Sequence, residues 1–229
     1  MTTTEPISGL CNLRAVPGVR ANVVWRSDVP LWLDAEQIAA LGGPGIQIDL
    51  RGTKECEHDG PGVLEGAGWT RHHLAFGEIG PRPDGPMPDF TDRAAAYSYI
   101  TSIGVGAVAD AFELLAGAEV PVLFHCTAGK DRTGILAIAL GLALGVPREV
   151  AVADYVRSAK VIEEIDRRYL SLPSVRTHDS PVTPSAFPVT AEMAGTVLDT
   201  IAANGGLDAW LATAGAAPDL SDRIRARLG

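Results

Sequence analysis

The sequence has few cysteines, no strongly basic segment and no long apolar run. Its 229 residues contain only Cys11, Cys56 and Cys126, with no CxxC pair, so we expect neither a disulfide framework nor a thiolate metal site. The formal net charge of −9 argues against a nucleic-acid partner, because a polyanion requires a basic surface. The longest apolar run, residues 135–146, has 12 residues, which is too few to cross a bilayer and suits a buried core helix.

The opening residues, MTTTEPISGL, lack the basic start and apolar stretch of a signal peptide. With so few cysteines, the expected location is a reducing cytoplasm, and export by another route stays open. Hydrophobic residues make up 46% of the chain and charged residues 21%, with no break in composition. We therefore expect one domain covering residues 1–229, with no transmembrane segment.

Short β-rich segments alternate with helical patterns through the first 126 residues. Strands are predicted at 22–27, 46–52, 68–76 and 120–126, and helices at 33–43 and 91–118. The run VPVLFHC at 120–126 has the composition of a central buried strand. This alternation predicts an α/β fold with a mainly parallel central sheet flanked by helices.

The C-terminal third reads as helical. An apolar helix over 132–146 is followed from Pro147 by a second helix to Leu170, and three further helices are predicted after residue 189. Two segments read as loops: residues 77–88, where seven of twelve residues are Gly or Pro, and residues 171–188, which carry four prolines.

The segment VLFHCTAGKDRTG, residues 122–134, combines a strand, a tight loop and a helix start. Such a turn aims backbone N–H groups at one point, and the helix dipole adds positive potential there. A thiolate at Cys126 would face this pocket as a nucleophile, and Arg132, six residues later, could grip two oxygens of a phosphate.

Other residues of this segment have supporting parts. Gly129 is expected to supply a positive φ or room for the backbone to wrap an anion, and Gly134 to let the helix approach the sheet. Thr133 could hydrogen-bond the thiolate. His125 is expected to be a buried orienting group rather than a base, since a preformed thiolate needs no base.

The sequence HCTAGKDRTG resembles the HCxxGxxRT/S signature of the cysteine-dependent protein-tyrosine phosphatase superfamily. Its GKDRTG form resembles a bacterial branch active on phosphotyrosine, on phosphoserine or phosphothreonine and, in some members, on phosphoinositides. Four further segments are similar to that branch: NLRAVPG (12–18), WRSD (25–28), IDLRG (48–52) and VADYVRS (152–158). The resemblance implies a phosphatase fold, a phosphorylated protein or phosphoinositide as substrate, inorganic phosphate as product, and no cofactor or metal.

By this resemblance Cys126 is the nucleophile that forms a phosphocysteine, Arg132 is the phosphate clamp, and Lys130 widens the positive mouth of the pocket. No Trp-Pro-Asp tripeptide is present, so the general acid implied by the branch is Asp131, with Asp84 and Asp89 as competing choices. The remaining residues that the resemblance places around the substrate are Thr127, Ala128, Gly129, Thr133 and Asp49.

Several alternatives stay open at this stage. Asp49 and Arg51 could equally form an ion pair at a strand end. Tyr155 and Arg157 could line the pocket or lie on a helix surface with ordinary contacts. His72 and His73 adjoin in a strand and point to opposite faces, so they cannot share a metal.

Two other functions compete with the phosphatase. One is a phospho-ligand binding module with weak catalysis, because the usual acid motif is missing. The other is a sulfur transferase of rhodanese type, ranked last because its loop is typically one residue shorter. A nucleotide-binding P-loop is discarded because GxxxxGK[ST] is absent.

Overall fold

The computed structural model describes residues 9–20, 23–77, 89–172 and 187–229. It contains a five-stranded sheet in the order β1-β2-β5-β3-β4. The strands are β1 (Arg14–Ala15), β2 (Val24–Ser27), β3 (Ile46–Asp49), β4 (Thr70–His73) and β5 (Val122–His125). Only β1 is antiparallel to its neighbour, and the other pairs are parallel. The mainly parallel sheet predicted from the sequence is confirmed.

β5 lies at the centre of the sheet, between β2 and β3, and all four of its residues are buried. In register, His125 is opposite Ser27 on one side and Asp49 on the other. Because parallel strands end at the same edge, the segments that follow β2, β3 and β5 emerge together. This edge is where ligands bind in open α/β sheets.

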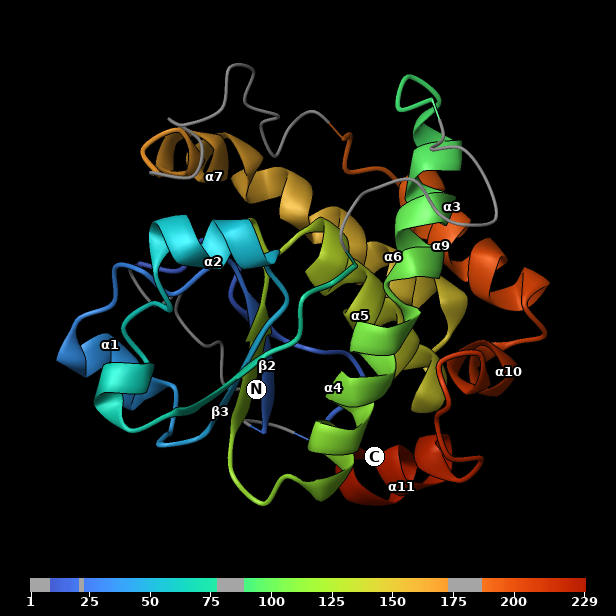
Figure 1. Ribbon diagram of the computed structural model, residues 1–229, viewed down its shortest axis with the longest axis horizontal. Helices are drawn as coiled ribbons and strands as arrows, with labels where there is room; N and C mark the ends of the chain where they lie inside the picture. Colours follow the sequence, from blue (N-terminus) through green and yellow to red (C-terminus); the bar gives the residue numbers. More distant parts are fainter. Residues whose placement is uncertain (1–8, 21–22, 78–88, 173–186) are drawn as a thin grey trace.

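Alternation along β5 separates two apolar clusters. Val122 and Phe124 face a large core shared with the helices, and Leu123 faces a smaller one with Trp25 and Trp69. Figure 1 shows α1 (Ala35–Ala40) on one side of the sheet and the main helical bundle on the other. Both faces are therefore covered, as a parallel sheet requires.

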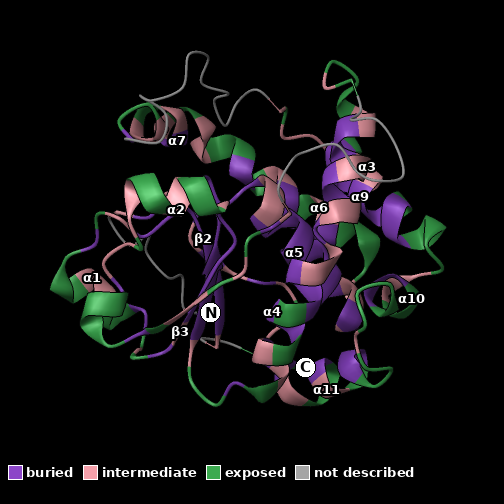
Figure 2. Ribbon diagram, viewed as in Figure 1, coloured by how far each residue is buried: buried purple, intermediate pink, exposed green. Residues whose placement is uncertain are grey.

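The helical bundle is built around α5 (Asp131–Ala143), which Figure 2 shows as almost entirely buried. The helix is apolar on all its faces. It suits this position because a helix without a polar face must be buried on every side. The other elements that the structure describes are α2 (Thr53–Asp59), η1 (Glu65–Ala67), α3 (Arg93–Ile103), α4 (Val105–Gly117), α6 (Arg148–Val156), η2 (Arg157–Val161), α7 (Ile162–Tyr169), α9 (Ala191–Ala203), α10 (Leu207–Ala212) and α11 (Leu220–Leu228).

Two helices predicted as single are divided. The segment 91–118 breaks at Gly104, where a Cβ would come within 2.0 Å of the Phe76 ring. The segment from Pro147 to Leu170 is interrupted by η2, although it contains no internal Gly or Pro. There Arg14 bonds the Asp154 carbonyl and the Ser158 hydroxyl. Arg14 is far from this segment in the sequence, so the helical pattern of the segment does not predict the contact.

In the described part of the chain, no single helix has the length and apolarity needed to span a membrane. The pair α3 and α4 meets these criteria together, but the two helices are bent by 51°. Most of the predicted loop at 77–88, with Asp84, and most of that at 171–188 lie outside the described residues.

Candidate active site

The Cys126 loop, defined here as residues 126–132, begins where the central strand ends and runs into the first turn of α5. Cys126 is 2% exposed, at the start of this loop. Strand, loop and helix start follow one another as the sequence predicts.

The carbonyl groups of the loop are bound from outside it. Val29 N–H donates to the Thr127 carbonyl at 3.1 Å, and the Asn12 side chain donates to the Ala128 carbonyl at 3.1 Å. In a trans peptide the carbonyl and the next N–H point in opposite directions. The N–H groups that follow these carbonyls are therefore directed to the inner side of the loop, where they can meet an anion.

Gly129 is required by its conformation and by its neighbours. Its φ is +65°, and a Cβ there would lie 2.3 Å from the Ser27 carbonyl oxygen. Gly134 has a somewhat different role from the one predicted, since a Cβ there would meet the Tyr155 ring of α6 at 2.8 Å. The small residue makes room for a neighbouring helix more than for the sheet.

Arg132 is held by Glu55, which comes from the first turn of α2. The guanidinium forms two bonds with the carboxylate, at 2.5 and 2.9 Å, and Thr127 donates its hydroxyl to the same carboxylate. Burial alone would raise the pKa of Glu55, but the charge and hydrogen bonds of Arg132 outweigh it and lower that pKa to about 2. The carboxylate is thus ionised and fixes the direction of the guanidinium.

Lys130 lies inside the fold rather than at the mouth of the pocket, where the sequence analysis placed it. Its side chain is fully buried, and Nζ donates to the Phe187 carbonyl at 2.7 Å. The ammonium is also 3.4 Å from Asp131 Oδ1. The reason for the burial is that the segment preceding α9 packs beside the loop, which no local pattern indicates.

Asp131 is the first residue of α5, with 24% of its side chain exposed. Its Oδ1 accepts a hydrogen bond from the Tyr97 hydroxyl, which also bonds the Tyr155 hydroxyl. Burial and the neighbouring Asp131 charge raise the pKa of Tyr97 well above its usual value, so the phenol stays protonated and remains a donor. Tyr155 is therefore buried behind the loop and is not on an open helix surface.

Thr133 and His125 flank the Cys126 loop in the sequence, and the predicted hydrogen bond from Thr133 to the Cys126 sulfur is not formed among the described residues. Thr133 is buried, and within the described residues its hydroxyl has no hydrogen-bond partner, which leaves it available to a thiolate or phosphate. His125 is fully buried, and burial lowers its pKa to about 4 despite the opposing charge of Asp49. Gln47 donates to His125 Nε2 at 2.8 Å, so Nδ1 carries the proton and faces the Cys126 carbonyl at 3.1 Å.

Asp49 lies at the end of β3, fully buried. Its carboxylate pairs with Arg51 at 2.7 Å and Arg71 at 2.9 Å, so the ion pair considered as an alternative is present. Burial by itself would raise the pKa of Asp49, but the charge of His125 and the charge and hydrogen bonds of Arg51 together hold it far below its usual range. Both oxygens already have cationic partners, and a substrate-binding role for Asp49 stays a prediction.

Of the two competing acids, the structure describes only Asp89. Asp89 is exposed at a turn before α3 and accepts a bond from Thr91 N–H, and Asp84 lies outside the described residues.

His73 bonds the Arg51 carbonyl. Among the residues described, no group of three or more His, Cys, Asp or Glu side chains is placed to hold a metal.

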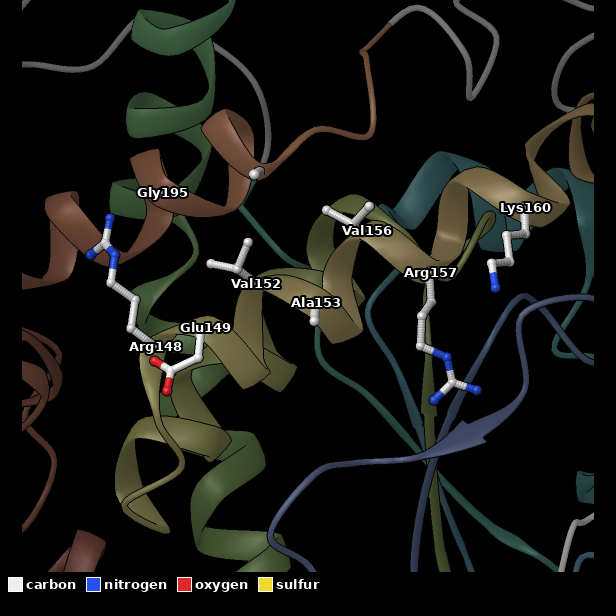
Figure 3. Close-up of a pocket in the computed structure, with 9 residues that line it drawn as sticks. Arg148, Glu149, Val152, Ala153, Val156, Arg157, Lys160 and Gly195 are labelled. Carbon is white, nitrogen blue, oxygen red and sulfur yellow. The ribbon is translucent and has the colours of Figure 1, made fainter.

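Arg157 belongs to a different part of the surface. It is exposed and lines a hollow of about 660 Å³ between α6 with η2 and α9 (Figure 3). The other residues lining this hollow are Arg148, Glu149, Val152, Ala153, Val156, Lys160, Ala191 and Gly195.

Comparison with protein families agrees with this geometry. The family model described as "Tyrosine phosphatase family" matches residues 6–229, nearly the whole chain. The chain belongs to this family. The resemblance inferred from the signature is thus confirmed, and the fold is that expected of a tyrosine phosphatase.

Three curated phosphatases share shorter stretches with this family member. The triple specificity protein phosphatase PtpB of Mycobacterium tuberculosis is 44% identical over 63 residues, which is 24% of this chain and 23% of the relative. A putative tyrosine-protein phosphatase of Cupriavidus necator is 57% identical over 37 residues, or 16% of this chain and 14% of the relative. A tyrosine-protein phosphatase of Nostoc commune is 57% identical over 42 residues, 18% of this chain and 14% of the relative. The matched regions span less than a quarter of each relative.

The family signature did not indicate Glu55. Its position three residues after Gly52 matches the acidic half of a helix capping box, and Glu55 accepts from Gly52 N–H at 2.7 Å, while Gly52 has no side chain to supply the other half. This local pattern explains the hydrogen bond between Gly52 N–H and the Glu55 carboxylate. The contacts with Arg132 and Thr127, 77 and 72 residues away, depend on the tertiary fold.

Proposed function

We propose that this protein is a phosphomonoesterase that hydrolyses phosphotyrosine through a phosphocysteine intermediate, as a single domain over residues 1–229. The observation that carries the proposal is the position of the buried Cys126 at the start of a loop whose carbonyl groups are bound from outside. Its amide groups and Arg132 then supply positive potential towards one tetrahedral anion. Preorganised electrostatics of this kind are the main source of acceleration in phosphoryl transfer.

In the first step the Cys126 thiolate forms a bond to phosphorus while the bond from phosphorus to the tyrosine oxygen breaks. Asp131, which must be protonated before this step, gives its proton to the departing oxygen. In the second step water attacks phosphorus, Asp131 takes its proton, and the sulfur–phosphorus bond breaks. Inorganic phosphate leaves and the thiolate is restored.

The remaining loop residues bind the phosphoryl group. The amides of Thr127, Ala128, Gly129 and Lys130 form the cradle, with the ammonium of Lys130 adding positive charge beneath it. Thr133, with its unpartnered hydroxyl, stabilises the sulfur. We place the reaction in the cytoplasm, with no nucleic acid and no cofactor involved.

The substrate class follows the family, with phosphotyrosine first and phosphoserine, phosphothreonine and phosphoinositides as further candidates. A relative that carries the name "triple specificity" supports testing all three. The second candidate function, a phospho-ligand binding module with weak catalysis, is favoured by one contact, since Tyr97 already engages an oxygen of Asp131.

The test compares initial rates on a phosphotyrosine peptide, a phosphoserine peptide and a soluble phosphoinositide, with Cys126→Ser as the blank. We expect release of phosphate that Cys126→Ser abolishes, and a sulfur-bound phosphate that can be trapped by rapid denaturation. Binding of the phosphotyrosine peptide without turnover, even of an activated aryl phosphate, would establish the binding module instead.

The acid is tested separately with Asp131→Asn, Asp89→Asn and Asp84→Asn. We expect Asp131→Asn to lower turnover of phenyl phosphate by about 100-fold or more, and to affect an activated aryl phosphate much less. If only Asp89→Asn or Asp84→Asn lowers the rate, Asp131 is not the acid.

A further inference from the structure

Asn12 connects the start of the chain to the Cys126 loop. It is buried, and its carboxamide donates one hydrogen bond to the Ala128 carbonyl at 3.1 Å and one to the Gly129 carbonyl at 3.0 Å. We propose that Asn12 is a positioning residue that turns these two peptide groups so that their N–H groups face the phosphate. The inference rests on the proposed function, because it concerns how the same site is held in its working form.

The orientation of the Asn12 amide is determined by its neighbours. Arg14, which carries only donors, donates to Asn12 Oδ1, while the two loop carbonyls can only accept. The oxygen must therefore face Arg14 and the nitrogen must face the loop. The backbone is held as well, since Asn12 N–H donates to Asp28 Oδ1 at 2.8 Å.

A buried ion cluster stands behind this amide. Asp154 of α6 binds Arg14 at 2.7 Å and Arg26 at 2.7 Å. Arg26 then donates to the Gly129 carbonyl at 3.0 Å, so that this carbonyl receives two donors. The resembling segments 12–18, 25–28 and 152–158 thus meet at one place, behind the loop.

The two hydrogen bonds from Asn12 matter because each of these peptide groups has an alternative orientation that is unfavourable. A rotation of either peptide would direct a carbonyl oxygen at the thiolate and at the phosphate, where it would repel both. Gly129, with its positive φ, is free to make such a rotation, since glycine lacks the steric restriction of a Cβ. Buried carbonyls without a donor are unfavourable, so the Asn12 donors favour the productive orientation.

The test uses two variants and one control. Asn12→Leu removes both donors without adding charge, and Asn12→Asp keeps the shape and the acceptor for Arg14 but loses the donors. Ser158→Ala is the matched control, because it removes another buried bond to Arg14, at 3.1 Å, without touching the loop. Circular dichroism and thermal melting show which variants are folded.

Three readouts are compared with the wild type. The first is the rate of Cys126 alkylation by iodoacetamide as a function of pH, and the second is competitive inhibition by inorganic phosphate. The third is the division of the activity loss between kcat and KM on a phosphotyrosine peptide.

For Asn12→Leu we expect the midpoint of the alkylation profile to move up by about one pH unit. We also expect phosphate inhibition to weaken about 10-fold and kcat to fall by roughly 100-fold, because the cradle acts on the transition state. Asn12→Asp should behave in the same direction, and it keeps the proposal testable if Asn12→Leu does not fold. Ser158→Ala should lower the melting temperature and leave the alkylation midpoint unchanged.

The positioning role is overturned if a folded Asn12 variant keeps the wild-type alkylation midpoint and phosphate inhibition. It is also overturned if Ser158→Ala moves both by as much as Asn12→Leu does, since the effect would then reflect loss of stability. Absence of turnover in the wild type would instead refute the proposed function. Alkylation and phosphate binding would still report on the orientation of the loop in that case.

Discussion

Two buried carboxylates, Asp154 and Asp49, each bind two arginines, and they lie on opposite sides of the central strand. The Asp154 cluster consists of Asp154, Arg14 and Arg26, and the Asp49 cluster of Asp49, Arg51 and Arg71. In both, burial raises the pKa of the aspartate and nearby cations more than compensate, chiefly Arg26 and Arg14 for Asp154 and His125 and Arg51 for Asp49, so both carboxylates are ionised.

The clusters differ in what their arginines do with their remaining donors. Arg26 reaches the Gly129 carbonyl of the Cys126 loop at 3.0 Å, whereas Arg51 reaches the Gly60 carbonyl after α2 at 2.8 Å. The first cluster therefore supports the Cys126 loop, and the second supports the end of β3 and the helix that follows it. The two clusters have similar compositions, but their arginines bond different backbone carbonyls, so the clusters support different parts of the fold.

The largest effect is expected for Asp154→Asn, which leaves two buried guanidinium groups without their carboxylate. Breaking a buried ion pair by removing one partner costs about 3–5 kcal/mol. Activity of the folded fraction should fall roughly 10- to 100-fold as the loop loses its support. Urea unfolding combined with kcat/KM per folded molecule measures both. Full activity in the folded fraction would show that the cluster has no part in the site.

Asp49→Asn should destabilise the protein by a similar amount, about 3–5 kcal/mol, but with little loss of kcat/KM per folded molecule. The reason is that the Asp49 oxygens face Arg51 and Arg71 rather than the cradle. The same two measurements apply. A loss of about 100-fold or more in folded protein would instead place Asp49 in the chemistry, which is the role that the family resemblance implies.

Glu55→Gln tests how Arg132 is oriented, because the Glu55 carboxylate binds the guanidinium of Arg132. We expect kcat/KM to fall about 10-fold as the guanidinium loses its fixed direction. The pKa of Glu55 is lowered to about 2 in the folded protein, so its contribution to stability is present above about pH 4.5 and is lost as the pH falls towards 2.

The destabilisation caused by Glu55→Gln should therefore be about 1–3 kcal/mol at pH 7 and should shrink in acid. Denaturant titrations of both proteins from pH 7 to pH 3 provide the comparison. A destabilisation that does not change over this range would contradict the assigned ion pair.

Asp28 should give the smallest effect, visible mainly as pH dependence. It is buried behind the loop, and burial raises its pKa to about 6. The folded protein therefore binds this proton more tightly than the unfolded chain does. Stability from this group is complete below about pH 4 and is lost as the pH rises through 6.

Asp28→Asn removes that titration while keeping an oxygen for Asn12 N–H. The stability of the variant relative to the wild type should thus rise between pH 4 and pH 6, by at most about 3 kcal/mol. Unfolding free energies measured across this range test the expectation. A constant difference between the two proteins would mean that Asp28 titrates normally.

Local sequence was sufficient for the fold class and for recognising the family. β-rich apolar segments predicted β2, β3 and β5, alternation predicted β4, and the apolar run at 120–126 predicted that β5 is central. Gly104 and η2 were missed as helix breaks because a packed ring and a distant arginine cause them. The burial of Lys130 was missed for the same reason, since Phe187 is its partner.

The sequence by itself determined the order of strand, Cys126 loop and helix, because hydrophobic periodicity, turn residues and a short signature are all local. Tertiary structure alone decided how the loop is held, since Asn12 meets it across 116 residues and Glu55 meets Arg132 across 77. Such contacts arise where parallel strands end at one edge of the sheet. Their directions depend on how the strands and helices pack, which no window along the chain contains.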